Sequence, residues 1–173
     1  MTEVINIVSG PGCGKSTLAT HLFAIMKAKQ YETEIVTEYA KELSTKSIDI
    51  GFLEQLGVFH QQLCREEVYI GNTDYLITDS PWILPAVYGK IYQPEHTNLW
   101  DEMLRSISAY RKKSDIIDRW FFLERQHPYN PNNRYEDKQK AEEIDNIIYY
   151  DYLDVYAPNF MVVRNPQDII DVL

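Results

Sequence analysis

Short apolar runs alternate along the chain with segments whose apolar residues recur at helical spacing. The first run, at 4–8, is β-branched and leads into a loop of small residues, which is typical of a buried strand. The segment 15–29 has apolar residues at helical spacing without internal glycine or proline, and predicts a helix. The same two patterns predict strands at 34–37, 74–81, 117–123 and 159–163, and helices at 39–43, 53–69, 83–88, 98–113, 135–156 and 168–173.

This order of elements predicts an α/β fold. Strands that alternate with helices form βαβ units, and such units build a parallel sheet covered by helices on both faces. The 173 residues fit one domain, and the sequence contains no internal repeat, low-complexity tract or interdomain linker. We therefore expect a single domain over residues 1–173.

Composition and charge exclude several classes of protein. With 17 basic and 26 acidic residues the formal charge is −9, which argues against a cation-coated nucleic-acid binder but allows a local basic groove. No apolar run approaches the roughly 18 residues of a membrane span, and no signal-type segment follows Met1. Two cysteines are too few for a disulfide framework or a four-cysteine zinc site. We expect a soluble, cytoplasmic protein without a membrane partner.

The strongest motif lies between the first predicted strand and the first predicted helix. Residues 9–17 read Ser-Gly-Pro-Gly-Cys-Gly-Lys-Ser-Thr, which matches the nucleotide-binding P-loop except that Ser9 replaces the first glycine. Glycines let backbone N–H groups turn toward phosphate oxygens, and the helix N-terminus attracts the same anion. We expect Lys15 to contact the β- and γ-phosphates of ATP and Ser16 to ligate Mg²⁺. The predicted ATP-binding residues are Gly10, Pro11, Gly12, Cys13, Gly14, Lys15, Ser16 and Thr17.

Acidic residues follow two of the predicted strands. Asp79 stands at the tip of the strand beside the phosphate loop, where P-loop enzymes place an aspartate that orients Mg²⁺, although Asp-Ser-Pro is also ordinary turn chemistry. Glu38 follows the strand at 34–37, and its strand ends at the same edge of the sheet. There a carboxylate accepts the proton of an attacking hydroxyl, or simply favours the start of a helix. Both interpretations of Glu38 remain open on the sequence.

Two arginines flank a loop rich in proline and asparagine. Arg125 leaves the fourth predicted strand, and Arg134 precedes the next predicted helix. A mobile loop with arginines closes over a transferring phosphate and neutralises its developing charge. The planar guanidinium suits this role because it binds phosphate oxygens in pairs. We therefore expect a lid at about 125–135 and catalytic roles for both arginines.

These motifs together resemble small P-loop kinases of the nucleoside and nucleotide kinase group. The residues that carry the resemblance are the phosphate loop, Thr-Glu-Tyr-Ala-Lys at 37–41, Ile-Thr-Asp-Ser-Pro at 77–81 and Asn-Arg-Tyr at 133–135. The sequence looks most like the nicotinamide-riboside-kinase-like branch, which includes phage-encoded AAA-type ATPases and hydroxymethyluracil DNA kinases. The resemblance implies a three-layer P-loop fold, with a parallel sheet in the order 2-3-1-4-5, ATP and Mg²⁺ as cofactors, and Glu38 near the acceptor hydroxyl.

The resemblance and the residues together predict a kinase. It would transfer the γ-phosphoryl group of ATP to a hydroxyl of a nucleoside-like acceptor, with Lys15, Glu38 and Asp79 in the catalytic site. The net charge favours a free nucleoside or nucleotide as acceptor, whereas the phage-type resemblance favours a hydroxymethylated pyrimidine in DNA, and host cytoplasm as the location. The alternative is an ATPase or nucleotide-dependent switch that needs no acceptor. The sequence leaves the acceptor and the oligomeric state open.

Overall fold

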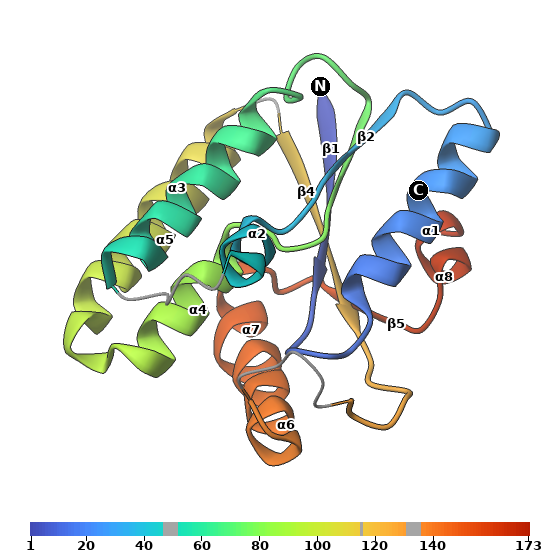
Figure 1. Cartoon of the computed structure of the whole chain (residues 1–173). Coiled ribbons are helices and arrows are strands. Elements are labelled where there is room, and N and C mark those ends of the chain that lie inside the picture. The colour runs from blue at the N-terminus through green and yellow to red at the C-terminus, as the bar shows by residue number, and fades with distance from the viewer. Residues whose placement is uncertain (47–51, 115, 131–135) are drawn as a thin grey trace.

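A computed structural model describes residues 1–46, 52–114, 116–130 and 136–173 (Figure 1). Over these residues the strands form a five-stranded sheet in the order β2-β3-β1-β4-β5, and every pairing is parallel. The predicted strand order is therefore confirmed. The strands are β1 (Thr2–Val8), β2 (Thr33–Val36), β3 (Tyr75–Thr78), β4 (Ile116–Leu123) and β5 (Met161–Val163).

Helices cover both faces of this sheet. In Figure 1 α1 and α8 lie on one side, and α3, α4 and α5 lie on the other. The helices are α1 (Lys15–Ala28), α2 (Tyr39–Thr45), α3 (Phe52–Glu67), α4 (Ile83–Tyr92), α5 (Thr97–Lys113), α6 (Lys138–Asn146), α7 (Asp154–Tyr156) and α8 (Pro166–Ile170), with a short 3₁₀ helix at Pro94–His96 and a π-helix at Ile147–Leu153. None of the helices in the described segments is long and apolar enough to span a membrane.

The alternation of side chains along β1 explains why both faces are covered. Ile5 and Ile7 are fully buried in the cluster beneath α1 and α8, whereas Val8 is buried in the cluster beneath α3, α4 and α5. Successive strand residues point to opposite faces, so a strand with buried apolar residues on both faces needs a layer on each side. This central strand thus fixes the three-layer arrangement.

Two helices in the C-terminal third differ from the sequence-based prediction. The last helix begins at Pro166 instead of 168, because Asn165 caps it through the N–H of Gln167 and proline favours the first helical position. The helix predicted at 135–156 consists of α6, the π-helix and α7. The π-helical turn brings Ile148, Tyr152 and Leu153 into the same apolar cluster. Periodicity alone does not reveal a wider turn of this kind.

A buried ion network joins α3, α5 and β4. Arg111 is 3% exposed and donates to Glu66 at 2.8 Å and to Asp118 at 2.7 and 2.8 Å. The amide of Asn6 in β1 donates to Asp118 at 2.8 Å. Burial raises the pKa of Glu66 to about 7, although the charge of Arg111 opposes this shift. The fold therefore holds a carboxyl group that takes up a proton near neutral pH.

Replacing Glu66 with glutamine is expected to remove a pH dependence of stability. The folded-state pKa of Glu66 lies above its ordinary value of 4.5, so the folded protein binds this proton more tightly than the unfolded chain. In wild type the free energy of unfolding should rise as the pH falls from about 8 to about 5, by at most about 3 kcal/mol. In Glu66→Gln this contribution should be absent. Urea unfolding at several pH values measures this, with Glu54→Gln on the exposed face of α3 as the control. Equal slopes in wild type and Glu66→Gln would contradict the prediction.

Candidate active site

The loop between β1 and α1 has the backbone shape that a phosphate requires. Gly12 and Gly14 adopt φ values of 75° and 98°, in the left-handed region where glycine is favoured. Gly14 is the residue before α1, so the unpaired N–H groups of the first helical turn face the loop. Ser9 is fully buried and has no positive φ. The backbone at this first position therefore accepts serine, which explains the departure from the usual motif.

Lys15 lies over the loop and not in the core. Its Nζ donates to the carbonyl oxygens of Ser9 at 2.9 Å and of Gly10 at 3.0 Å. Carbonyl groups are weaker partners for an ammonium ion than phosphate oxygens. A nucleotide in the loop would therefore compete well for this side chain.

Asp145 in α6 ties the phosphate loop to Arg125. Its Oδ1 accepts the N–H of Gly10 at 2.6 Å, and its Oδ2 lies 2.7 Å from Nη2 and 2.8 Å from Nε of Arg125. Arg125 also donates to the carbonyl oxygen of Pro11 at 2.9 Å. A Cβ atom at position 10 would lie 2.7 Å from the Asp145 carboxylate, so only glycine fits there. We call this contact of Asp145 with Gly10 and Arg125 the loop latch.

The thiol of Cys13 lies beside the loop latch. Its Sγ is 3.6 Å from Oδ1 of Asp145, and the side chain is buried. Burial, and then the negative charge of Asp145, raises the pKa of Cys13. A raised pKa lowers the reactive thiolate fraction of Cys13 at neutral pH.

The segment after β4 packs against the phosphate loop. The ring of Tyr129 would lie 3.0 Å from a Cβ at Gly12, and the Arg125 guanidinium lies 5.8 Å from the centre of that ring. The hydroxyl of Tyr129 donates to the carbonyl oxygen of Glu136 at 2.5 Å. The segment predicted as a lid thus begins beside the phosphate loop, where Arg125 lies. Arg134 lies outside the described residues, and its role stays a prediction.

The environment of the Asp79 carboxylate suits a cation ligand. It follows β3, the strand that pairs with β1, and its backbone N–H donates to the carbonyl oxygen of Val36 at 3.1 Å. The side chain is 3% exposed, and within the described part of the chain its Oδ1 has no hydrogen-bond partner. A buried carboxylate oxygen left without a partner is costly, and a metal or a metal-bound water would satisfy it.

The residues present fit Mg²⁺ bound together with a nucleotide. Groups of three or more histidine, cysteine, aspartate or glutamate side chains that could hold a metal are absent from the described ranges. Mg²⁺ usually takes only one or two protein oxygens and completes its shell with phosphate and water. Ser16, in the first turn of α1, and Asp79 are the candidates for those two ligands.

Glu38 lies at the same edge of the sheet, two residues beyond the last pair of β2 with β3. The helix that follows it, α2, reaches the phosphate loop, because Nζ of Lys41 donates to Oγ of Ser16 at 2.6 Å. Burial, and then the charges of Glu136 and Glu38, raises the pKa of Tyr88 in α4 well above its usual range. Tyr88 therefore stays protonated at neutral pH.

Comparisons with known proteins give this chain a family and a fold. The sequence profile of the AAA domain family matches residues 4–166, which is nearly the whole chain. The chain belongs to the AAA domain family. A search of curated protein sequences gave no significant match.

Solved structures similar to this AAA domain show its fold. The crystal structure of NadR protein in complex with NR matches with a TM-score of 0.72 at 17% identity, over 98% of this chain and 50% of the NadR chain. The chain thus spans about half the length of NadR. Deoxyadenosine kinase from M. mycoides, with products dCMP and a flexible dCDP bound, matches with a TM-score of 0.56 at 16% identity, over 98% of this chain and 95% of that chain. The chain therefore shares its fold with NadR and with this deoxyadenosine kinase.

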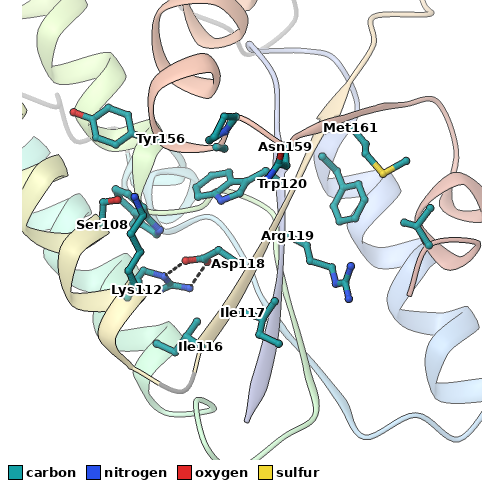
Figure 2. A pocket seen from close by; sticks show the side chains of 16 residues that line it. Ser108, Lys112, Ile116, Ile117, Asp118, Arg119, Trp120, Tyr156, Asn159 and Met161 are labelled. Atoms are coloured by element: carbon teal, nitrogen blue, oxygen red, sulfur yellow. Dashed lines mark hydrogen bonds and ion pairs between the residues drawn. The ribbon is translucent and has the colours of Figure 1, made fainter.

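The AAA domain also has a groove of about 410 Å³ away from the phosphate loop (Figure 2). It follows the amino-terminal part of β4, between α5 and the segment before β5, and its lining includes Ser108, Lys112 and Asn159. None of the residues expected in the active site lines it. The size of this groove is therefore no guide to the chemistry of the loop.

Two residues that this AAA domain places at the site had no predicted role. Asp145 lies far along the chain in a highly charged helix, where nothing local distinguishes it from solvated acids. Lys41 belongs to the Thr-Glu-Tyr-Ala-Lys motif at 37–41, but no local pattern gives it a role of its own.

Proposed function

We propose that this protein is an ATP-dependent kinase that transfers the γ-phosphoryl group to a hydroxyl of a nucleoside-like acceptor. The observation that supports this best is the bond from Lys41 to Ser16. In this structure the bond ties α2, the helix that directly follows Glu38, to the phosphate loop, which supports a role for Glu38 beside that loop. An acid there suits a kinase as proton acceptor and an ATPase as the group that positions water, and the Glu38 variant below separates the two.

The residues of the site have separate roles in this proposal. Lys15 and the loop N–H groups bind the phosphates, and Arg125, with Arg134 of the predicted lid, neutralises charge that develops during transfer. Glu38 accepts the proton of the attacking hydroxyl. Mg²⁺, held by Ser16 and Asp79, would supply charge neutralisation at the phosphate oxygens. Most of the catalysis then comes from positioning and electrostatics.

Two kinds of acceptor suit this site. A free nucleoside or nucleotide agrees with the net charge of −9 and with the ligands of the similar structures, which are NR in NadR and dCMP and dCDP in deoxyadenosine kinase. A hydroxymethylated pyrimidine in DNA agrees with the phage-type sequence resemblance and would enter as a flipped base. Incubation with labelled ATP, a nucleoside panel, and DNA with and without hydroxymethyluracil identifies which acceptor gains the label.

Glu38→Gln is expected to separate a kinase from an ATPase. The amide keeps the shape of the side chain but accepts no proton. The rate of acceptor labelling should therefore fall by roughly 10²-fold, which is the rate factor that general-base catalysis contributes. Binding of ATP should persist because the phosphate loop is unchanged. The matched control is Glu42→Gln, because Glu42 is an exposed acid of α2 that pairs with Arg65.

The same variant tests the alternative function. If the protein is an acceptor-independent ATPase, Glu38 positions water instead, so ATP hydrolysis without acceptor should collapse in Glu38→Gln and no acceptor should gain label. Unchanged rates in both assays would leave Glu38 as a residue that only favours the start of α2.

A further inference from the structure

Lys41 makes a contact that the proposed roles leave unexplained. Its Nζ lies 2.6 Å from Oγ of Ser16, although the two residues are 25 positions apart and both belong to first turns of helices that begin at the same edge of the sheet. An exposed lysine loses much side-chain freedom when it is fixed at one hydroxyl. In this structure Ser16 is therefore held by a cation at the oxygen that we expect to ligate Mg²⁺.

Two cations cannot share this oxygen without cost. The ammonium of Lys41 and a divalent metal at Ser16 would lie within a few ångströms of each other and repel. Binding of the metal–nucleotide complex should therefore release Lys41 from Ser16. The same complex brings a strong anion to the spot, because a metal ligated by the loop serine of a P-loop contacts the terminal phosphate.

The position of α2 limits where the released side chain can go. Glu38 directly precedes α2, and Lys41 lies in the first turn of that helix, three residues further on. Lys15 approaches from the loop, where it now contacts the carbonyl oxygens of Ser9 and Gly10. Lys41 approaches from the first turn of α2, the helix that directly follows Glu38, which is the residue expected near the acceptor. The two lysines therefore reach the phosphate loop from two different elements.

We propose, on the basis of the proposed kinase function, that Lys41 is a further catalytic residue that leaves Ser16 when metal and ATP bind and then contacts the phosphoryl group in transit. In the reaction the acceptor hydroxyl gives its proton to Glu38, and its oxygen bonds to the γ-phosphorus. The bond from that phosphorus to the β–γ bridging oxygen breaks, and ADP leaves. Lys41 gains and loses no atom; its positive charge stabilises the equatorial oxygens while these bonds change.

Lys41→Met tests both parts of this proposal. Calorimetric titration of Mg²⁺ in the presence of AMP-PNP should reach half-saturation at a concentration lower by about threefold or more, because the competing charge is gone. In the labelling assay kcat should fall by roughly 10-fold or more with little change in the KM for ATP, as for a contact made in the transition state. Lys41→Arg should restore most of kcat, and Lys46→Met, an exposed lysine just after α2, should match wild type in both assays.

The outcomes separate this inference from the function on which it depends. If wild type labels no acceptor, the kinase function fails and the catalytic role of Lys41 fails with it. If wild type labels an acceptor but Lys41→Met keeps a normal kcat, only the role of Lys41 is overturned. An unchanged Mg²⁺ titration would likewise overturn the competition at Ser16, whatever the acceptor proves to be.

Discussion

Lys15→Ala is expected to abolish phosphoryl transfer and to leave the ligand-free protein folded. Among the described residues the hydrogen bonds of the ammonium go to the carbonyl oxygens of Ser9 and Gly10, and the side chain is half-buried, so its loss should change the free energy of unfolding by about 1 kcal/mol or less. In the loaded enzyme the same charge should face the phosphates, and its loss should lower kcat on the order of 10³-fold. Product labelling and thermal unfolding measure the two effects.

Lys29→Ala is the matched control for this prediction. Lys29 is exposed at the C-terminal end of α1, at the other end of the helix from the phosphate loop. Its substitution removes the same charge from the protein as Lys15→Ala. Its activity and stability should equal those of wild type. Near-normal turnover of Lys15→Ala would show that the loop does not bind the transferred phosphate.

Asp145→Ala is expected to have the largest effect on stability among the site variants. The carboxylate is 14% exposed and Arg125 is 13% exposed, so its removal leaves a nearly buried guanidinium and the N–H of Gly10 without their partner. Removal of one partner from a buried ion pair costs about 3 kcal/mol or more. Urea unfolding should detect this loss. The KM for ATP should also rise because the loop loses the contact that holds its first turn.

Two further variants separate charge from the hydrogen bond in the loop latch. Asp145→Asn keeps an acceptor for the N–H of Gly10 but loses the charge opposite Arg125, so its stability should lie between wild type and Asp145→Ala. Glu142→Ala removes an exposed charge of the same helix, whose contact to Lys138 is 3.6 Å long, and should cost less than about 1 kcal/mol. Equal stability of Asp145→Ala and Glu142→Ala would refute the loop latch.

The strands and the position of the loop were predictable because their signals are local, whereas the order of the strands came from the resemblance to P-loop kinases. Apolar runs such as 4–8 mark buried strands wherever they occur, and the spacing from Gly14 to Ser16 is fixed by the geometry of a phosphate. The carboxyl ends of parallel strands meet at one edge, so Glu38 and Asp79 were expected near the loop once the strands were assigned. Their catalytic roles stay predictions.

The residues that escaped prediction depend on tertiary contacts. Asp145 is one acid among several in α6, and only the packing of that helix on Gly10 singles it out. Arg111 reads as one of the basic residues that end α5, yet it is buried because Glu66 and Asp118 come from other elements to pair with it. Charged residues inside a protein are paired across elements, and single-sequence patterns do not report such pairs.

The π-helix at Ile147–Leu153 changes how the loop latch should be sought in other sequences. A π turn contains one residue more than an α turn, so a homologue with an unbroken α-helix would have one residue fewer between its latch acid and the same core positions. An ungapped alignment anchored on Tyr152 would then place that acid opposite Asn146. Homologues should therefore be aligned with a single-residue gap allowed in this stretch, and an acid opposite Asn146 should be counted as the counterpart of Asp145.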